Sequence, residues 1–170
     1  PRCRAGAVGL PRAPRAAGAG IGGAVARRFL EEGARVLISD AHTRRLKAHE
    51  SALAEEFGPA SVAALPCDVT DEEQVRALFD AAVAAHGRLD VVVCSAGVSM
   101  RTYFERSDPA AMEQLVRVNF LGTLFITHAA IPHVRKTRGS LVALSSLTGL
   151  RGVPSYGPYG ATKFAIQGLY

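Results

Sequence analysis

The sequence lacks long hydrophobic runs and is poor in cysteine. No apolar stretch approaches the roughly 20 residues that a membrane-spanning helix needs, so no membrane span is expected. The three cysteines, Cys3, Cys67 and Cys94, are an odd and scattered set without metal-ligand or redox spacing. This pattern favours a reducing compartment, and we expect a cytoplasmic protein.

Several catalytic motifs are also missing. There is no G-x-S-x-G elbow, and no glycine-rich loop is followed by the lysine of a phosphate-binding P-loop. These absences exclude the hydrolases and nucleoside triphosphatases that depend on the two motifs. The five histidines have no metal-ligand spacing, so we expect no metal site.

Acidic residues are absent from the first fifteen positions, and this absence accounts for most of the net charge. The chain carries +5, of which four charges come from Arg2, Arg4, Arg12 and Arg15. The rest of the chain therefore carries only +1, with basic and acidic residues alternating along its expected helices. This distribution is typical of solvated helix faces, and we expect no nucleic-acid partner.

What is present fits one globular domain of alternating strands and helices. The length of 170 residues and the 48% hydrophobic content suit a single core. Strands are expected within 34–40, 61–71, 88–97 and 139–146, and helices within 21–32, 42–58, 71–86, 109–135 and 158–170. Short apolar strands between helices predict βαβ units. The fold class is α/β, a doubly wound parallel sheet with helices on both faces (Rossmann-like, three-layer α/β/α).

The N-terminal segment does not fit this pattern. Residues 1–15 are rich in proline and arginine, yet they stand where the first strand of such a sheet is needed. Pro11 and Pro14 would break an amphipathic helix, which argues against a transit peptide. We interpret 1–15 as a non-native or disordered segment from a wrong start site, reading frame or exon join, and 16–170 as the domain.

A glycine-rich turn and an aspartate indicate a bound dinucleotide. Gly18, Gly20 and Gly23 have G-x-G-x-x-G spacing at a helix start, where unpaired N–H groups favour phosphate. Asp40 ends the next strand, where an adenosine ribose would lie. Its carboxylate would accept hydrogen bonds from ribose hydroxyls and repel a 2′-phosphate, so NAD is preferred over NADP, although two arginines follow four and five residues later. The alternatives are glycines needed for packing and an aspartate that caps a helix.

A tyrosine and a lysine supply candidate acid–base chemistry. Tyr159 and Lys163 stand four residues apart in the last expected helix, so their side chains share one face. A nearby ammonium stabilises a phenolate, and such a pair suits proton transfer; an ordinary surface pair is the alternative. Tyr156 has no lysine four residues later. Ser145 and Ser146 end the preceding strand at the edge where ligands bind, and we interpret Ser145 as a cap of the strand–loop junction.

In this order, the glycine loop, Asp40, the serine pair and the Tyr–Lys pair resemble the short-chain dehydrogenase/reductase family from about Gly18 to Tyr170. The family's T-G-x-x-x-G-x-G loop aligns with Gly20 and Gly22, while Arg15 and Ala16 replace its threonine and first glycine. The stretches "CDV", "CSAG", "VNFLG", "ALSSLTG" and "YGATK" match further family motifs, although "CSAG" lacks both asparagines of the family turn. By this resemblance we expect the chain to lack the C-terminal part of the family domain.

The resemblance implies an NAD(P)-dependent oxidoreductase acting on a secondary alcohol or ketone. Tyr159 would move a proton at the substrate oxygen, Lys163 would hold the nicotinamide ribose, Ser146 would bind the substrate oxygen, and Asn119 would anchor a water. The resemblance and the glycine–aspartate pattern together place the cofactor at Gly18, Gly20, Ile21, Gly22, Asp40, Asp68, Val69, Ala96, Gly97, Tyr159 and Lys163.

Two functional hypotheses remain open from the sequence. The first is the enzyme, whose intact parent would be a homodimer or homotetramer formed through the helices of Asn119 and Tyr159. The second is a non-catalytic truncated fragment or isoform that binds a nucleotide or partner weakly. Met100, Tyr103 and Phe104 stand where the family begins to line its substrate site and suit an apolar carbonyl or alcohol.

Overall fold

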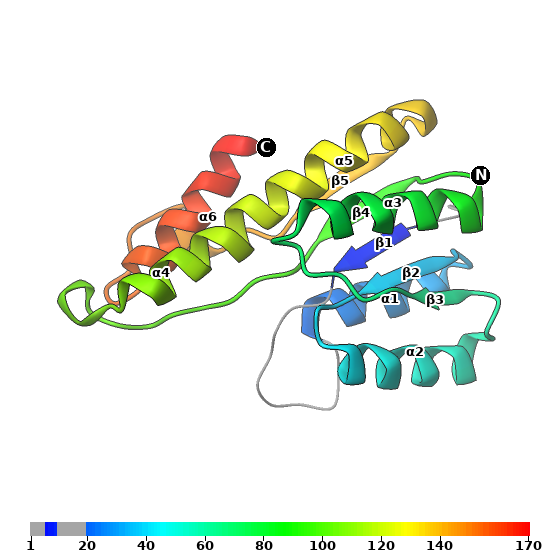
Figure 1. Cartoon of the computed structure of the whole chain (residues 1–170), viewed down its shortest axis with the longest axis horizontal. Coiled ribbons are helices and arrows are strands. Elements are labelled where there is room, and N and C mark those ends of the chain that lie inside the picture. Colours follow the sequence, from blue (N-terminus) through cyan, green and yellow to red (C-terminus); the bar gives the residue numbers. More distant parts are fainter. Residues whose placement is uncertain (1–5, 10–19) are drawn as a thin grey trace.

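The computed structural model describes residues 6–9 and 20–170. Figure 1 shows a parallel sheet with strand order β3-β2-β1-β4-β5. The strands are β1 Gly6–Gly9, β2 Val36–Ser39, β3 Val62–Ala64, β4 Val91–Cys94 and β5 Ser140–Ala143. The helices are α1 Gly20–Glu31, α2 Thr43–Phe57, α3 Glu72–His86, α4 Pro109–Leu115, α5 Gly122–Thr137 and α6 Gly157–Leu169, with a π-helical segment η2 Val116–Leu121 and short 3₁₀ turns η1 Phe104–Arg106 and η3 Leu147–Gly149.

Helices cover both faces of the sheet, as the alternation of elements predicts. Successive side chains of a strand point to opposite faces. Val36 and Ile38 of β2 accordingly pack in one buried cluster with α1 and α2, whereas Leu37 packs in the other with α3 and α5. Figure 1 shows α1 and α2 on one side of the sheet and α3 and α5 on the other. The predicted doubly wound α/β class is confirmed.

The order of the strands creates a crevice near the middle of the sheet. The chain moves outward from β1 to β2 and β3, then returns to the other side of β1 with β4 and β5. In such sheets ligands bind beyond the carboxyl ends of the strands, at the point where the order reverses. The loops after β2 and β4 therefore frame the expected site.

The central strand lies in the N-terminal segment, where the sequence shows no recognisable strand. Gly6–Gly9 pair in parallel with both β2 and β4. Four residues with two glycines have weak strand propensity, so local sequence does not reveal them. Their pairing comes from backbone hydrogen bonds with two neighbours. Residues 1–5 and 10–15 lie outside the described residues, and the origin of the segment stays a prediction.

The other strands lie where the apolar runs predict them, but they are shorter. The run 61–71 yields only Val62–Ala64, although the backbone N–H groups of Leu65 and Cys67 still bond to the chain at β2. Pro66 stands between them and lacks an N–H, which is tolerated because β3 pairs only with β2 among the described strands and Pro66 has no second neighbour to bond.

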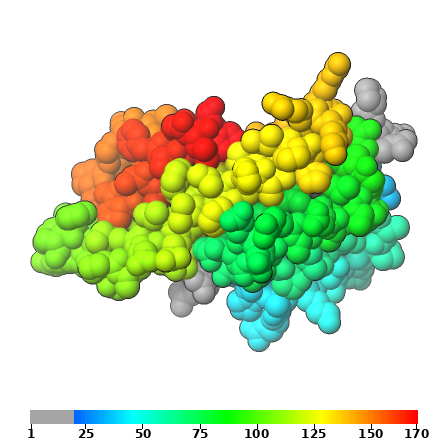
Figure 2. Space-filling view, turned by 45° about the horizontal axis from the view of Figure 1, so that its top comes forward, coloured from blue at the N-terminus to red at the C-terminus, as the bar shows by residue number. Residues whose placement is uncertain are grey.

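The long helix Pro109–Thr137 joins α4, η2 and α5. By length and apolar composition it alone among the described helices could cross a membrane, a test that the core helix of a soluble protein also passes. Its buried residues include Leu115, Asn119, Ile126 and Val134. Figure 2 shows this helix (lime to yellow) between the C-terminal segment (orange and red) and α3 (green). The expected absence of a membrane span stays a prediction.

Candidate active site

A cavity of about 270 Å³ opens at the carboxyl ends of β2 and β4. Five of its lining residues were predicted from the sequence to bind a cofactor, namely Asp40, Asp68, Val69, Ala96 and Gly97. They come from the loops after β2, β3 and β4, which parallel pairing brings to one edge. Apolar side chains of α3 and the long helix, Leu78, Phe79, Val118 and Ile126, complete the walls.

Asp40 lies at the polar end of this cavity. Its side chain is only 3% exposed, and its Oδ1 accepts a hydrogen bond from the His42 backbone N–H at 2.8 Å. The guanidinium of Arg45 contacts both carboxylate oxygens, at 2.6 to 2.9 Å. A buried carboxylate needs such partners because an unpaired buried charge is costly. Asp40 does not cap α2, since His42 occupies the cap position.

The loop after β3 supplies the next wall. Asp68 is exposed and accepts hydrogen bonds from the backbone N–H and the hydroxyl of Thr70, so its side chain orders its own turn. Val69 packs against Gly122 so closely that a Cβ there would lie 2.6 Å from Val69 Cγ2. This contact fixes the distance between the loop and the long helix.

The glycine loop is described only from Gly20 onward, and Gly18 lies outside the described residues. Gly20 opens α1 with a φ of 56°, a left-handed conformation that favours glycine. Gly22 is buried and Ile21 is exposed. The start of α1 contains no acidic residue in its first turn, so its N–H groups can face a phosphate.

Asn119 is fully buried in the π-helical segment η2 and joins three elements. Its Oδ1 accepts from the Val98 N–H at 2.8 Å, and its Nδ2 donates to the Val98 carbonyl at 2.9 Å and to Thr162 Oγ1 at 3.1 Å. The side chain therefore clamps the loop after β4 to α6. A π-helical turn holds more residues than an α-helical turn, and the sequence motif around Asn119 does not predict this change. Turns of this kind are frequent at functional sites.

Tyr159 and Lys163 share one face of α6. Lys163 is buried, its Nζ donates to the Leu144 carbonyl at 2.7 Å, and it lies 5.7 Å from the centroid of the Tyr159 ring. Burial lowers the pKa of Lys163. Tyr159 is half-buried, and its carbonyl accepts from Thr162 Oγ1 at 2.7 Å. A cation thus stands beside a partly accessible phenol.

The two serines after β5 have different partners. Ser145 Oγ donates to the Lys163 carbonyl at 3.2 Å, while Ser146 Oγ accepts from the Thr148 N–H at 3.2 Å. Gly149 lies so close that an added Cβ would be 2.6 Å from Ser145 Oγ. Ser145 therefore anchors α6 to the loop after β5.

Gly97 links the cavity to the tyrosine–lysine pair. It lines the cavity, and a Cβ built on it would lie 3.3 Å from Asn119 Oδ1 and 3.9 Å from Lys163 Nζ. Tyr159, Lys163 and Asn119 are not among the cavity's lining residues. The structure thus forms two adjoining parts, a cavity lined by the loops after β2, β3 and β4 and an acid–base corner, with Gly97 between them.

Three contributors to this site were missed by sequence reasoning. The Leu144 carbonyl and the Val98 backbone hold Lys163 and Asn119, and backbone groups leave no sequence signal. Thr162 bonds to Asn119 from the helix of the Tyr–Lys pair. Thr162 directly precedes Lys163, and adjacent helix residues do not share a face, so the sequence does not predict that Thr162 contributes to the site.

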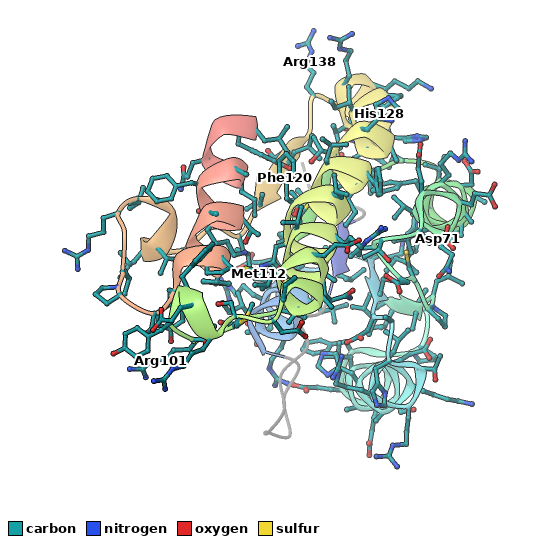
Figure 3. The ribbon with its side chains drawn as sticks, turned by 60° about the vertical axis from the view of Figure 1, so that its left-hand side comes forward. Asp71, Arg101, Met112, Phe120, His128 and Arg138 are labelled. Atoms are coloured by element: carbon teal, nitrogen blue, oxygen red, sulfur yellow. The ribbon has the colours of Figure 1, made fainter. Side chains whose placement is uncertain are left out.

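The loop after β4 also contacts the segment that leads into α6. The Thr102 N–H donates to the Ser155 carbonyl at 2.8 Å, and the Arg101 guanidinium lies 5.9 Å from the Tyr156 ring centroid. Tyr103 and Phe104 are exposed. Figure 3 shows Arg101 and Met112 at one end of the long helix and Arg138 at the other.

These residues fit a nicotinamide dinucleotide. Asp40 lines a cavity with apolar walls, and the space beside Gly97 is one that a side chain would fill. Helix α1 begins at Gly20 and follows the central strand β1 of the same sheet. Fold and site together define a nucleotide-binding α/β domain of the Rossmann type.

Comparison with known proteins places the chain within that class. The sequence profile of the family described as "short chain dehydrogenase" matches residues 15–170, and the chain belongs to this family. An L-fucose dehydrogenase from Bos taurus is 40% identical over 153 residues, which cover 89% of this chain and 54% of the relative. The chain thus spans about half the length of that relative.

Solved structures agree with the family. A short-chain dehydrogenase/reductase from Burkholderia phymatum in complex with NAD superposes with a TM-score of 0.88 at 25% identity, over 98% of this chain and 57% of the other. ElxO with NADP bound gives a TM-score of 0.86 at 31% identity, over 99% of this chain and 65% of the other. Structural neighbours therefore hold either nicotinamide cofactor.

Proposed function

We propose that the protein transfers a hydride between a nicotinamide cofactor and a secondary alcohol or ketone. The observation that carries this proposal is the placement of Lys163 Nζ 5.7 Å from the Tyr159 ring centroid, next to the cavity wall at Gly97. When bound, the nicotinamide supplies or accepts the hydride. Asp40 supports a preference for NAD, because a carboxylate binds ribose hydroxyls and repels a 2′-phosphate.

The chain's own residues supply the proton. The Tyr159 hydroxyl gives a proton to a ketone oxygen, or takes one from an alcohol, and the neighbouring Lys163 ammonium stabilises the phenolate that forms. Ser146, in the loop after β5, hydrogen-bonds the same substrate oxygen. Asn119 has both amide hydrogens engaged, so its side chain positions the loop and α6. Its main-chain carbonyl accepts from Thr123 Oγ1 at 2.8 Å, and the water that we assign to Asn119 would share this carbonyl.

Two further proposals follow from the site's surroundings. Val116 and Phe164 are exposed on the long helix and on α6, which supports self-association through these helices, as expected for a homodimer or homotetramer. The substrate is a small molecule with an apolar portion, because Tyr103 and Phe104 are exposed in the loop after β4. Cytoplasmic location stays a prediction from the cysteine pattern.

Replacement of the proposed acid–base residue tests the function. In Tyr159→Phe, turnover of a panel of secondary alcohols falls by at least about 100-fold, because a general acid–base group contributes that much. NADH binding, followed by fluorescence titration, stays within about twofold. Tyr156→Phe is the matched control, since it keeps the aromatic ring that contacts Arg101 and retains turnover.

Three outcomes would contradict the proposal. Full turnover by Tyr159→Phe would exclude its role as the proton donor. A folded wild-type chain that binds neither NADH nor NADPH would instead support the non-catalytic fragment. Binding without turnover in the 170-residue chain would support the weak nucleotide-binding alternative.

A further inference from the structure

Arg101, in the loop after β4, has no carboxylate partner within the described part of the chain. Its side chain is exposed, its Nε lies 3.4 Å from Ser155 Oγ, and its guanidinium lies 5.9 Å from the centroid of the Tyr156 ring. Arginines elsewhere on the surface, such as Arg88 and Arg117, bind a carboxylate of this chain. The two terminal nitrogens of Arg101 therefore remain available to an anion from outside.

A strained turn fixes the place of this arginine. Ser155 has a φ of 64°, a left-handed conformation that is uncommon for residues other than glycine. Its carbonyl accepts from the Thr102 N–H at 2.8 Å, so the residue next to Arg101 holds the turn in place. Strained residues persist where the surrounding structure holds them, and they gather at active sites and ligand clamps. Figure 3 shows Arg101 beside the loop that leads into α6.

The Tyr156 ring connects the guanidinium with the acid–base corner. Tyr156 and Tyr159 meet edge to face, with ring centroids 6.0 Å apart and an interplanar angle of 62°. Tyr159 in turn lies beside Lys163. The fold thus places an available cation one aromatic ring away from the proposed proton donor. A substrate whose oxygen meets Tyr159 can extend along Tyr156 toward Arg101.

The neighbours of Arg101 suit an apolar chain that ends in an anion. Tyr103 and Phe104 follow it in the same loop and are 61% and 71% exposed. Exposed apolar side chains that lie together offer surface to a hydrocarbon ligand. A planar guanidinium binds a carboxylate through two parallel hydrogen bonds, which also fixes the direction of the ligand. The loop therefore combines an apolar surface with one anion-binding group.

We propose that Arg101 binds a carboxylate of the substrate, so that the preferred substrates are oxo acids, or the corresponding hydroxy acids, with an apolar chain between the two groups. The inference rests on the proposed function and names its substrate class. The ketone oxygen meets Tyr159 and Ser146, and the carboxylate pairs with the terminal nitrogens of Arg101. Arg101 determines specificity and takes no part in the transfer of the proton or the hydride.

The test compares ligands that differ only in their charge. Methyl-ketone carboxylates with lengthening methylene chains, and the amide of each, are titrated by calorimetry into the 170-residue chain with NAD, which leaves the ketone unreduced. At the best chain length the carboxylate binds about fivefold more tightly than its amide, because an exposed ion pair is worth up to about 1 kcal/mol. This preference shrinks at high salt, since salt screens an exposed pair.

Three variants assign the preference to Arg101. Arg101→Gln removes the charge and abolishes the preference for the carboxylate. Arg101→Lys keeps the charge without the paired geometry and retains part of the preference, which provides a second measurement if Arg101→Gln is poorly folded. Arg106→Gln is the matched control, because Arg106 is an exposed arginine of the turn η1 and its replacement removes the same charge. It retains the full preference.

The outcomes separate this inference from the proposed function. Equal affinity for carboxylate and amide at every chain length, with both still bound, would overturn the role of Arg101 and leave the oxidoreductase proposal intact. A preference that persists in Arg101→Gln, or that is lost equally in Arg106→Gln, would also overturn that role. A folded chain that binds NAD but neither ketone would overturn the proposed function, and the substrate class with it.

Discussion

Glycine positions around Lys163 show how single residues shape the acid–base corner. A Cβ at Gly97 would press on Asn119 and Lys163, and a Cβ at Gly149 would lie 2.7 Å from the Lys163 carbonyl. Neither Gly97 nor Gly149 is among the glycines with a positive φ, so neither is required for a left-handed turn. They are needed because backbone and side chains approach closely at these two points. Space, more than conformational freedom, decides their identity.

Gly149→Ala should therefore lower stability. The new methyl would meet Ser145 Oγ and the Lys163 backbone at less than 3.0 Å, so α6 must shift away from the loop after β5. Overpacking of this kind costs about 1–3 kcal/mol. Urea unfolding measures the change, and turnover should fall with it because Lys163 moves.

Gly152→Ala is the control for this prediction. Gly152 lies in the same loop region, and nothing lies within 4 Å of a Cβ built on it. Its stability should stay within about 0.5 kcal/mol of wild type. Equal stability of the two variants would show that the contact at Gly149 relaxes freely.

At the scale of elements, helix ends rather than helix interiors set the geometry of the site. Asp71 caps α3 by accepting from the N–H groups of Glu73 and Gln74, at 3.0 and 3.1 Å. Asp108 caps α4 in the same way, with Pro109 as the first helical residue. The loop after β3 ends at the first of these caps, and the segment that follows β4 ends at the second. The π-helical segment then rotates the long helix so that Asn119 faces α6.

The cap at Asp71 should make stability depend on pH. Hydrogen bonds from Gln74, backbone first, lower the pKa of Asp71 below its unfolded value. A carboxyl group with a lowered folded pKa contributes stability above its unfolded pKa and loses it as pH falls through the folded pKa. Asp71→Ala should therefore lower the Tm at neutral pH and make little difference in strong acid.

Asp71→Asn separates the hydrogen bonds from the charge. Asparagine also caps helices but does not titrate, so its Tm should lie above that of the alanine variant at neutral pH. The Tm difference between Asp71→Asn and Asp71→Ala should therefore not shrink as the pH falls, whereas the Tm difference between wild type and Asp71→Ala should shrink. Thermal melts across the acidic range provide the measurement, and a difference between wild type and alanine that is constant with pH would contradict the assignment.

At the scale of the whole molecule, the sheet has an open edge. Among the described strands β5 pairs with β4 alone, and Val142 in β5 is 41% exposed. An exposed apolar edge strand offers backbone groups and side chains for pairing with another chain. The 170-residue chain should therefore self-associate through this edge.

Val142→Lys tests the edge. A lysine on an edge strand disfavours pairing, so light scattering should show weaker concentration-dependent association than for wild type. Ala52→Lys is the control, because Ala52 is exposed on α2 and its lysine adds the same charge away from both the strand and the long helix. Equal reduction by both variants would show that net charge, not the strand edge, governs association.

Much of the fold was predictable because its signals are local. The apolar runs around Val36 and Val91 predict buried parallel strands, and the amphipathic stretches predict the helices that cover them. The strand Gly6–Gly9 escaped prediction because its placement depends on two partners distant in sequence. A pairing between strands carries no local signal when the strand itself is short and rich in glycine.

The sequence by itself determined the class of fold, the family motifs, and the helical spacing that sets Tyr159 beside Lys163, since these depend on periodicity and residue type. Only the tertiary structure decided that Arg45 occupies the Asp40 carboxylate, that the Leu144 carbonyl holds Lys163, and that Asn119 joins the loop after β4 to α6. Such contacts depend on where separate elements meet at the sheet edge. Periodicity fixes which face a side chain takes, but the packing of the elements decides which partner it finds there.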